Sequence, residues 1–386
     1  MISFDNTENA FKAKSDSDLK KSYFLFKLIS NRFLVKYGGA FAPLALKFGF
    51  KNLIKNTIFK QFVGGENIHD CSQTIAILGK YNIGTILDYS VEGKESEEDF
   101  DHCLTETLET INKAKDDVNI PFCVFKVTGL ARFDLLLKVS ASQNLNDVEL
   151  TEWTKVKDRV NKICKSAWAG QQPIFIDAEE SWIQTAIDDL ANENMSEYNK
   201  SIPIVYNTFQ FYRHDRLSYL KQTIEKGRAN GFKVGAKLVR GAYMEKERKR
   251  AIELNYTSPI QKNKENADND YNAALKLCVE NIEVMGLCAG THNEKSSMIL
   301  VELMKLHNII PSDKRIYFSQ LIGMSDHISY NLSINGYNVA KYVPYGPVKD
   351  VLPYLIRRAQ ENTSVKGQTG RELNLIIKEK KRRAGK

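Results

Sequence analysis

Two signals that would place the chain in a membrane or outside the cell are missing from the sequence. Lys or Gly interrupts the longest apolar runs well short of the roughly 18 residues that a transmembrane helix needs. The first residues include early acids, and no positively charged region followed by an apolar stretch, which a secretory signal would have. We therefore expect a cytoplasmic protein with no membrane-spanning segment.

Metal-binding and disulfide patterns are missing as well. The six cysteines are scattered without C-x-x-C spacing, and the six histidines show no paired metal-ligand spacing. In a chain of 386 residues such cysteines are expected to be reduced, partly buried side chains rather than a disulfide framework. We predict no metal site.

From about residue 82 onward, short apolar β-branched runs alternate with longer amphipathic segments. The composition, 42% hydrophobic and 26% charged, is that of a soluble globular protein. Eight strands alternating with helices over roughly 280 residues predict an α/β fold, a (βα)8 barrel. A doubly wound open sheet is the alternative, but its G-x-G-x-x-G turn is absent. The expected strands are 84–89, 122–127, 173–177, 202–206, 234–239, 286–291, 315–318 and 337–342, and the helical patterns between them include 99–114, 154–167, 182–193, 216–230, 268–285 and 294–307.

Positive charge gathers at the two ends of the chain. The net charge is +8, and from Lys20 to Gly65 there are nine Lys or Arg residues and no acid. Lys47, Lys51 and Lys55 recur at i, i+4 among apolar neighbours, as in an amphipathic basic helix. Such a helix either packs on the main domain with a solvated lysine face or docks on anionic lipid. We expect an N-terminal helical region over 1–80, a barrel over 81–365 and a basic C-terminal tail over 366–386.

Polar residues close or follow several of the expected strands. In a barrel, reactive groups gather at strand ends, although a single charge there is usually solvated. Several converging on one barrel mouth indicate a site. They are Lys126; Asp177, followed by Glu179 and Glu180; Lys237 and Arg240; Thr291, His292 and Asn293; and Tyr342.

The last helical pattern places two arginines beside a tyrosine. Tyr354, Arg357, Arg358 and Glu361 are spaced i, i+3, i+4 and i+7, so they share one helical face. The arginines could merely pair with Glu361 and solvent. Two guanidinium groups beside a tyrosine can also hold a small carboxylate through bidentate hydrogen bonds, and Lys126 would complete such an anion clamp.

Several of these segments resemble the proline dehydrogenase family, in the family's order, over about residues 80 to 365. The similar motifs are Phe125-Lys126-Val127-Thr128-Gly129-Leu130-Ala131, Ile176-Asp177-Ala178-Glu179-Glu180, Lys237-Leu238-Val239-Arg240-Gly241-Ala242-Tyr243, Thr291-His292-Asn293, Tyr342-Val343-Pro344-Tyr345-Gly346 and 354–362. Ser258-Pro259-Ile260-Gln261, followed by Asp270-Tyr271-Asn272, resembles the monofunctional members.

The resemblance implies a distorted TIM-like barrel with the last helix over its mouth, noncovalent FAD, and oxidation of L-proline to Δ1-pyrroline-5-carboxylate by hydride transfer to the flavin N5. The implied substrate-binding residues are Lys126, Leu321, Tyr354, Arg357 and Arg358. Asp177, Lys237 and Tyr342 are implied to be catalytic: Asp177 orders the polar network beside the substrate, Lys237 lies near N5, and Tyr342 backs the ring and holds Arg357. The implied FAD site comprises Asn207, Lys237, Arg240, Gly241, Ala242, Tyr243, Thr291, His292, Asn293, Gln320 and Glu361.

Two positions depart from many bacterial members of the family. Lys237 stands in place of an arginine, and we place Asn207 at the end of the fourth strand, where those members have glutamine. A lysine can still donate a hydrogen bond to N5, but it lacks the planar fork of arginine. Tyr342 favours proline as the substrate, because hydroxyproline-oxidising relatives tend to have a small residue there.

The resemblance also implies partners. We expect a membrane quinone as electron acceptor, with the Lys47/Lys51/Lys55 segment in peripheral contact with the inner face of the membrane. A separate pyrroline-5-carboxylate dehydrogenase could receive the product. Two rival functions remain open: a lyase in which Lys237 or Lys126 forms a Schiff base, and a basic nucleic-acid-binding protein. We expect no nucleic-acid partner.

Overall fold

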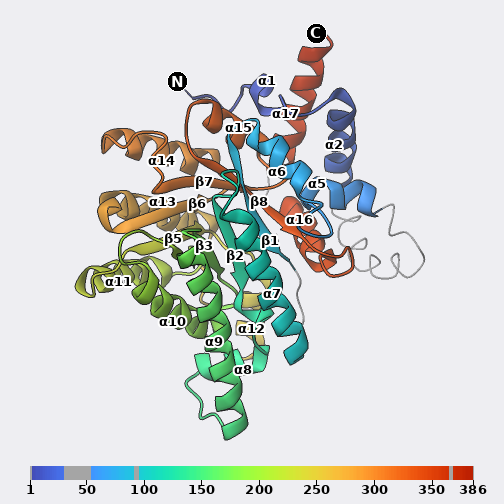
Figure 1. The fold of residues 1–386 in the computed structure, drawn as a ribbon. Helices are drawn as coiled ribbons and strands as arrows, with labels where there is room; N and C mark the ends of the chain where they lie inside the picture. Colours follow the sequence, from blue (N-terminus) through green and yellow to red (C-terminus); the bar gives the residue numbers. More distant parts are fainter. Residues whose placement is uncertain (1, 30–53, 91–94, 365–367, 386) are drawn as a thin grey trace. The chain divides into compact units, whose positions relative to one another are not determined.

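The computed structural model describes residues 2–29, 54–90, 95–364 and 368–385, without the side chains of 359–364, 368 and 369. Figure 1 draws the described helices and strands in colours that follow the sequence. The chain divides into two compact units. Gly93–Ser319 forms one, the central unit. Met1–Glu92 and Gln320–Lys386 together form the other, the terminal unit.

Eight strands in sequence order form a closed barrel, which confirms the predicted fold class. The pairing is parallel, as the alternation with helices requires. Within the terminal unit, β1 pairs with β8 in a register that runs from Ile83↔Val339 to Tyr89↔Tyr345. The strands are β1 (Ile83–Tyr89), β2 (Phe122–Lys126), β3 (Ile174–Asp177), β4 (Val205–Gln210), β5 (Val234–Val239), β6 (Met285–Gly290), β7 (Ile316–Leu321) and β8 (Val339–Tyr345).

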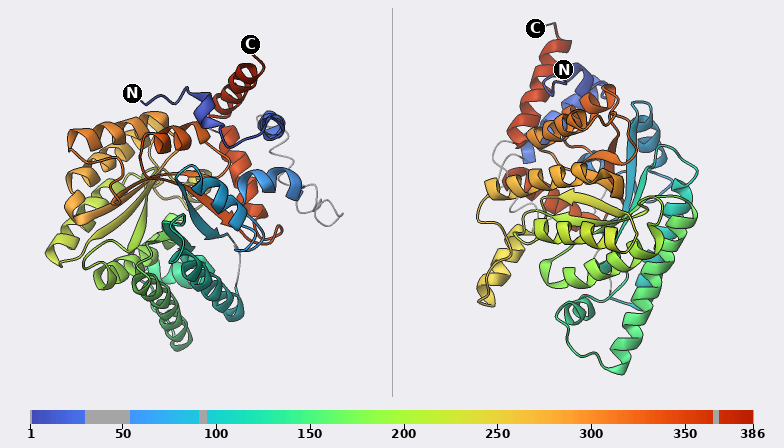
Figure 2. Two further views of the ribbon diagram at one scale, coloured as in Figure 1. Left: turned by 45° about the horizontal axis from the view of Figure 1, so that its top comes forward. Right: turned by 90° about the vertical axis from the view of Figure 1, so that its left-hand side faces the viewer.

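The helices of the central unit lie on the outer side of its strands (Figure 2). Local sequence fixes several of their starts: Asn146 and Glu149 form a capping box, and the Asn263 and Asn293 side chains each cap the helix that follows. The helices are α7 (Glu97–Ala114), α8 (Phe133–Ser140), α9 (Asp147–Ala169), α10 (Ser181–Tyr198), α11 (Arg216–Ala229), α12 (Met244–Glu253), α13 (Lys264–Glu280) and α14 (Glu294–Leu306).

Aromatic rings pack together near the starts of four strands in the central unit. Phe122 stacks on Phe175 with ring centroids 4.4 Å apart. Tyr206 and Tyr317 meet the Phe122 ring edge-on at 5.5 and 4.9 Å. Rings in this geometry bury large apolar areas and favour one arrangement. A rigid apolar layer therefore lies below the polar residues at the other end of these strands.

Three strands end later than the sequence pattern indicates. β4 runs over Val205–Gln210, although the apolar run suggested 202–206. Pro203 has no N–H for the ladder, so that run cannot start the strand as expected. β7 and β8 likewise extend to Leu321 and Tyr345. In each strand, the polar or aromatic residues that the sequence pattern placed in the following loop belong to the last part of the strand.

In the terminal unit, the two ends of the chain pack on each other. Leu375 and Ile376 of α17 are buried in one cluster with Phe11, Leu19 and Phe26. The region expected as a basic tail thus contains a helix with an apolar face. The helices of this unit are α1 (Thr7–Ala10), α2 (Asp16–Ile29), α5 (Lys60–Phe62), α6 (Ser72–Gly79), α15 (Asp326–Ile334), α16 (Leu352–Ser364) and α17 (Gln368–Arg383), with a π-helical turn over Lys55–Phe59.

The terminal unit also contains a buried cluster of charges. The Lys341 side chain is 0% exposed, and its Nζ lies 2.9 Å from Asp326 Oδ1 and donates to the Met324 carbonyl at 2.5 Å. Lys14 Nζ lies 3.0 Å from Asp326 Oδ2. Burial would raise the pKa of Asp326, but the charges of Lys14 and Lys341 outweigh it and lower that pKa. The N-terminal segment, α15 and β8 therefore meet at this carboxylate.

Within the described residues, no helix is both long and apolar enough to span a bilayer. The same residues contain no group of three or more His, Cys, Asp or Glu side chains arranged to hold a metal ion. All six cysteines are buried and free, as their spacing predicted. Burial raises the pKa of the Cys71 and Cys288 thiols to about 12, so they are poor nucleophiles.

Candidate active site

A buried lysine–aspartate pair joins two strands of the central unit: Asp177 ends β3, and Lys237 is the fourth of the six residues of β5. Lys237 Nζ donates to Asp177 Oδ1, with only 8% and 12% of the two side chains exposed. Thr208 Oγ1 also donates to Asp177, at 3.4 Å, and Lys237 Nζ lies 5.1 Å from the centroid of the Phe175 ring. The structure thus brings together Asp177 and Lys237, two of the residues named from the resemblance.

Strand register places Lys126 in the same row as this pair. Lys126, the last residue of β2, is the register partner of Asp177, the last residue of β3, and Thr208 is the partner of Lys237. Register partners in parallel strands project to the same face of the sheet. The row therefore offers two cations, a carboxylate and a hydroxyl to a small polar ligand.

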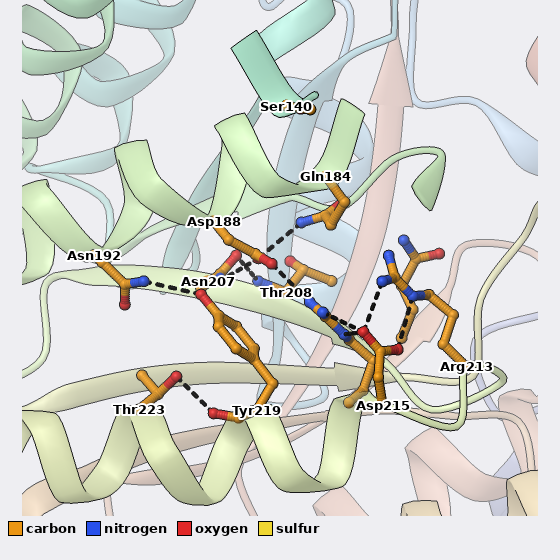
Figure 3. Close-up of polar contacts among 12 residues, drawn as sticks. Ser140, Gln184, Asp188, Asn192, Asn207, Thr208, Arg213, Asp215, Tyr219 and Thr223 are labelled. Atoms are coloured by element: carbon orange, nitrogen blue, oxygen red, sulfur yellow. Dashed lines mark hydrogen bonds and ion pairs between the residues drawn. The ribbon is translucent and has the colours of Figure 1, made fainter. Parts of the chain in front are cut away.

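Asn207 does not lie where we expected it. It is the third of six residues in β4, and Gln210 ends the strand. Its carboxamide is fully buried: Nδ2 donates to Asp188 Oδ1 at 2.9 Å and Oδ1 accepts from Thr208 N at 2.8 Å (Figure 3). Because strand side chains alternate, Asn207 faces the helices, whereas Gln210 at the end of the strand lies on the same face as Thr208.

Asp188 of α10 is the centre of the network behind β4. Its carboxylate accepts from Gln184 Nε2 at 2.9 Å, Asn207 Nδ2 at 2.9 Å and Arg216 Nη1 at 2.6 Å (Figure 3). Arg216 also donates to Asp215, which Arg213 binds through two nitrogens. Burial opposes ionisation of Asp215, but the two arginines lower its pKa to about 2. The network fixes β4 and the start of α11.

Arg240 lies in the loop that follows β5, and three side chains from other parts of the central unit hold it. Its Nε donates to Asp268 at 2.6 Å, Nη1 to Thr291 at 2.8 Å and Nη2 to Ser296 at 2.9 Å. The guanidinium also lies over the Tyr271 ring, 4.4 Å from its centroid. Asn293 N donates to Thr291 Oγ1, so residues after β5 and β6 form one polar surface.

Gly241 has a backbone conformation that other residues rarely adopt. Its φ is +126°, and a Cβ atom there would lie 2.5 Å from the Tyr212 ring. Gly241 and Ala242 are exposed, whereas Tyr243 and His292 are half-buried. Only glycine leaves the backbone open at this point, and such openings let a ligand approach the main chain.

The terminal unit contains the other predicted substrate-binding residues. Tyr354 and Arg358 of α16 are 6% and 8% exposed, and the Arg358 guanidinium lies 5.1 Å from the Tyr354 ring centroid. Leu321 packs against the apolar cluster that contains Tyr354. Arg357 is half-buried on the same helix. The predicted helical face is therefore present, although the Glu361 side chain lies outside the described residues.

Two further predicted residues of this unit belong to strands. Tyr342 is 8% exposed and is the fourth of the seven residues of β8, so it does not close the strand as expected. Its carbonyl accepts from Ile322 N at 2.9 Å, which joins it to the end of β7. Gln320 is buried in β7, and its Oε1 accepts from Ser329 Oγ at 2.8 Å.

The sequence argument gave no role to Thr128, Glu179 and Gln210. Glu179 accepts hydrogen bonds from the backbone and hydroxyl of Thr128, and its carbonyl accepts from Gln210 Nε2 at 2.6 Å. Gln210 could have been found from its position at the end of β4. The Thr128–Glu179 contact joins residues 51 positions apart, and no local pattern signals it.

A family model described as "Proline dehydrogenase" matches residues 71–371. The chain belongs to the proline dehydrogenase family. It is 33% identical to "Proline dehydrogenase 1, mitochondrial" of Dictyostelium discoideum, over 98% of this chain and 74% of that protein. Membership of this family makes the chain an oxidoreductase.

Other relatives in the proline dehydrogenase family carry different names. "Hydroxyproline dehydrogenase" of Xenopus laevis is 30% identical, over 97% of this chain and 88% of that protein. "Carbapenem antibiotics biosynthesis protein CarD" of Pectobacterium carotovorum subsp. carotovorum is 31% identical over 83% of each. Membership of the family therefore leaves the substrate to be argued from the site.

The solved structures agree on the fold. Proline utilization A (PutA) from Bdellovibrio bacteriovorus, inactivated by N-propargylglycine, superposes with a TM-score of 0.74 at 19% identity. The match covers 93% of this chain and 38% of the PutA chain. This member of the proline dehydrogenase family thus corresponds to a minor part of that longer protein.

Proposed function

We propose that this chain oxidises L-proline to Δ1-pyrroline-5-carboxylate with noncovalently bound FAD. The observation that carries the proposal is the buried Lys237–Asp177 pair, which joins β5 to the end of β3, in a chain of the proline dehydrogenase family. A buried lysine whose charge is balanced by a carboxylate is a fixed hydrogen-bond donor, which a redox ring needs at the atom that gains electrons.

The substrate's carboxylate would bind Arg357, Arg358 and Lys126. Arg358 is already oriented by the Tyr354 ring, so less side-chain entropy is lost when a carboxylate binds. Leu321 and Tyr354 would pack on the pyrrolidine ring. Tyr342 would back that ring, and its bulk favours proline over a hydroxylated ring.

The residues after β5 and β6 fit a large cofactor with phosphate and hydroxyl groups. Gly241 opens the backbone, Arg240 supplies a cation fixed by Asp268, and Thr291 supplies a hydroxyl. Tyr212 adds a buried hydroxyl for which the described residues offer no hydrogen-bond partner. FAD, when bound, would accept a hydride from the substrate's C5. The residues proposed to hold it are Lys237, Arg240, Gly241, Ala242, Tyr243, Thr291, His292, Asn293, Gln320, Glu361 and, in place of Asn207, Gln210.

The protein's own part in the reaction would be position and charge. Asp177 holds Lys237 in place, and the arginines and Lys126 fix the substrate's carboxylate, so the C5–H bond is oriented before any bond breaks. Asp177 and Lys237 are largely shielded from water, which strengthens these electrostatic contacts.

The visible spectrum tests this proposal. The purified protein is expected to be yellow, with flavin bands that bleach when L-proline is added anaerobically. A colourless protein that also fails to bind added FAD would contradict it. Faster bleaching with hydroxyproline than with proline would instead assign the other substrate.

Substitution of the arginines tests the carboxylate assignment. Arg357→Met or Arg358→Met is expected to raise the KM for proline by about 10- to 100-fold while FAD stays bound, because only the substrate's charge loses its partner. Arg371→Met on α17, an arginine that pairs with Asp5 at 2.8 Å, is the matched control. Loss of FAD from the two α16 variants would show that these arginines bind the cofactor.

We also propose a membrane quinone as the electron acceptor, reached by peripheral contact with the membrane. Lys47 and Lys51 lie outside the described residues, and Lys55 pairs with Glu66 at 2.5 Å. On α2, Phe24 and Leu28 are 58% and 57% exposed beside exposed lysines, which is compatible with an anionic lipid surface.

Sedimentation with vesicles tests the membrane contact. Replacing Lys47, Lys51 and Lys55 with Glu should reduce co-sedimentation with anionic vesicles. Phe24→Ser with Leu28→Ser should do the same if α2 takes part. Unchanged co-sedimentation of both variants would reject the membrane contact. We also propose that a separate dehydrogenase acts on the released imine. The match to 38% of the PutA chain is compatible with this division of labour between two proteins.

A further inference from the structure

The turn after β2 is held by a carboxylate from the loop after β3. β2 ends at Lys126, and the chain continues in a short 3-10 turn, Val127–Gly129. Glu179 Oε1 accepts from Thr128 N at 3.1 Å, and Oε2 accepts from Thr128 Oγ1 at 2.5 Å. Both carboxylate oxygens therefore bind one residue, two positions after Lys126.

Glu179 is itself fixed from two other sides. Its N–H donates to Gln184 Oε1 at 2.8 Å, and its carbonyl accepts from Gln210 Nε2 at 2.6 Å. Gln184 in turn donates to Asp188 at 2.9 Å (Figure 3). A shift of Glu179 would break contacts to α10 and β4, so the carboxylate is a rigid support rather than a mobile one.

The ionised form of Glu179 is costly to bury, and Lys126 offsets that cost. The residue is 4% exposed. Burial raises the pKa of its carboxyl to about 7; the Lys126 charge and the Thr128 hydrogen bonds act in the opposite direction, and Glu180 adds to the rise. A glutamine would link the same loops without a buried charge. The positive charge of Lys126 therefore explains why a glutamate, rather than a glutamine, is buried at position 179.

We propose that Glu179 is a positioning residue for Lys126: by binding Thr128 and balancing the lysine's charge, it holds the ammonium group ready for the substrate's carboxylate. This inference rests on the proposed function, in which Lys126 binds that carboxylate. Lysine has a flexible four-carbon stem, so fixing its backbone and giving it an anion reduces the entropy lost on binding.

Substitutions at the two ends of this contact test the inference. Glu179→Ala is expected to raise the KM for proline by about tenfold with kcat within about threefold, since carboxylate binding contributes equally before and during the reaction. Thr128→Val removes the hydroxyl at nearly constant shape and should raise KM by about threefold. Glu179→Gln can still link the two loops through Thr128 but lacks the charge that balances Lys126, so it should recover only part of the loss. Unchanged KM in both Glu179→Ala and Thr128→Val would overturn the inference.

A double-mutant cycle separates positioning from a general structural role. If Glu179 acts through Lys126, Glu179→Ala should raise KM little further in a Lys126→Met background. Equal increases in the two backgrounds would overturn the inference. If Glu179→Ala does not fold, Thr128→Val takes its place in the cycle, and the same comparison of KM in the two backgrounds tests the inference.

Glu180→Gln is the matched control, because the neighbouring acid binds Lys246 instead and should leave KM within about twofold of wild type. Failure of the proposed function would show differently. The wild-type flavin would then not be reduced by proline at all. A wild-type protein that proline reduces, with no effect of Glu179→Ala on KM, would refute the positioning role alone.

Discussion

The two units each bury a lysine–aspartate pair, and the two pairs differ in what surrounds them. Lys341 of the terminal unit is fully buried and donates to the Met324 carbonyl, while Asp326 also binds Lys14. Lys237 of the central unit lies over the Phe175 ring and pairs with Asp177, the last residue of β3; the two side chains are 8% and 12% exposed.

The difference shows how one kind of ion pair can serve two purposes. The Lys341 pair joins the N-terminal segment to β8 and the start of α15. The contacts described for it are all to other residues of the protein. The Lys237 pair lies in a row of polar residues where strands end, the position at which barrels place reactive groups. We therefore expect the first pair to govern stability and the second to govern activity.

Removing Lys341 should produce the largest effect. Lys341→Met leaves Asp326 buried without the fully buried one of its two cations, which is expected to lower the free energy of unfolding by about 3–5 kcal/mol. Urea denaturation measures the loss, and the rate per bound flavin should be unchanged. The exposed Lys12→Met is the control. A stable Lys341→Met variant with a slow reaction would reverse the assignment.

Removing Lys237 should affect the reaction more than the fold. Lys237→Met is expected to lower kcat for proline by about 10²–10³-fold, as does loss of one fixed donor at a site of developing charge. Anaerobic stopped-flow reduction of the flavin measures it, with the exposed Lys221→Met as control. Full activity in Lys237→Met would show that this pair, too, is only structural.

A change of pH should affect stability in opposite directions through one buried carboxyl group of each unit. The lowered pKa of Asp326 means that its contribution to stability is complete above about pH 5 and is lost as pH falls below about 3.8, the ordinary pKa of an aspartate. The raised pKa of Glu179 means that stability falls as pH rises from 4.5 to about 7.

Unfolding midpoints measured across pH separate these contributions. Asp326→Asn should flatten the decline in acid, and Glu179→Gln should flatten the decline between pH 4.5 and 7, each by roughly 1–2 kcal/mol. Wild-type pH dependence in either variant would contradict the electrostatic origin given for that residue.

The smallest effect is expected at the solvent side of the Asp326 cluster. Lys14 is 20% exposed, so Lys14→Met should cost about 1 kcal/mol or less and lower Tm only slightly. A loss as large as that of Lys341→Met would mean that anchoring of the N-terminal segment, and not the buried lysine, dominates the cluster.

The sequence pattern predicted the barrel because alternation of strands and helices is a local signal that repeats eight times. It placed β5 at its observed bounds, 234–239. It misplaced β4 because polar residues that face other elements look like loop: Asn207 is satisfied by Asp188, which lies on α10, a different element.

The site could be predicted only in part for the same reason. Lys126 and Asp177 were found because each ends an apolar strand. The contact between Thr128 and Glu179, and the network centred on Asp188, depend on residues that meet only after folding. The family-like motifs contain Thr128 and Glu179, but a motif does not show that these two residues contact each other.

The pairing of β1 with β8 has a consequence for how the chain is made. Ile83 meets Val339, a separation of 339 − 83 = 256 residues. At about 5–20 residues per second, a ribosome needs roughly 13–50 s to cover that distance. Throughout that time the β8-facing edge of β1, with Ile83, Ile86 and Leu87 fully buried in the final fold, has no partner strand. The nascent protein is therefore most exposed to misassociation at β1, the strand that is made first and has to wait for β8.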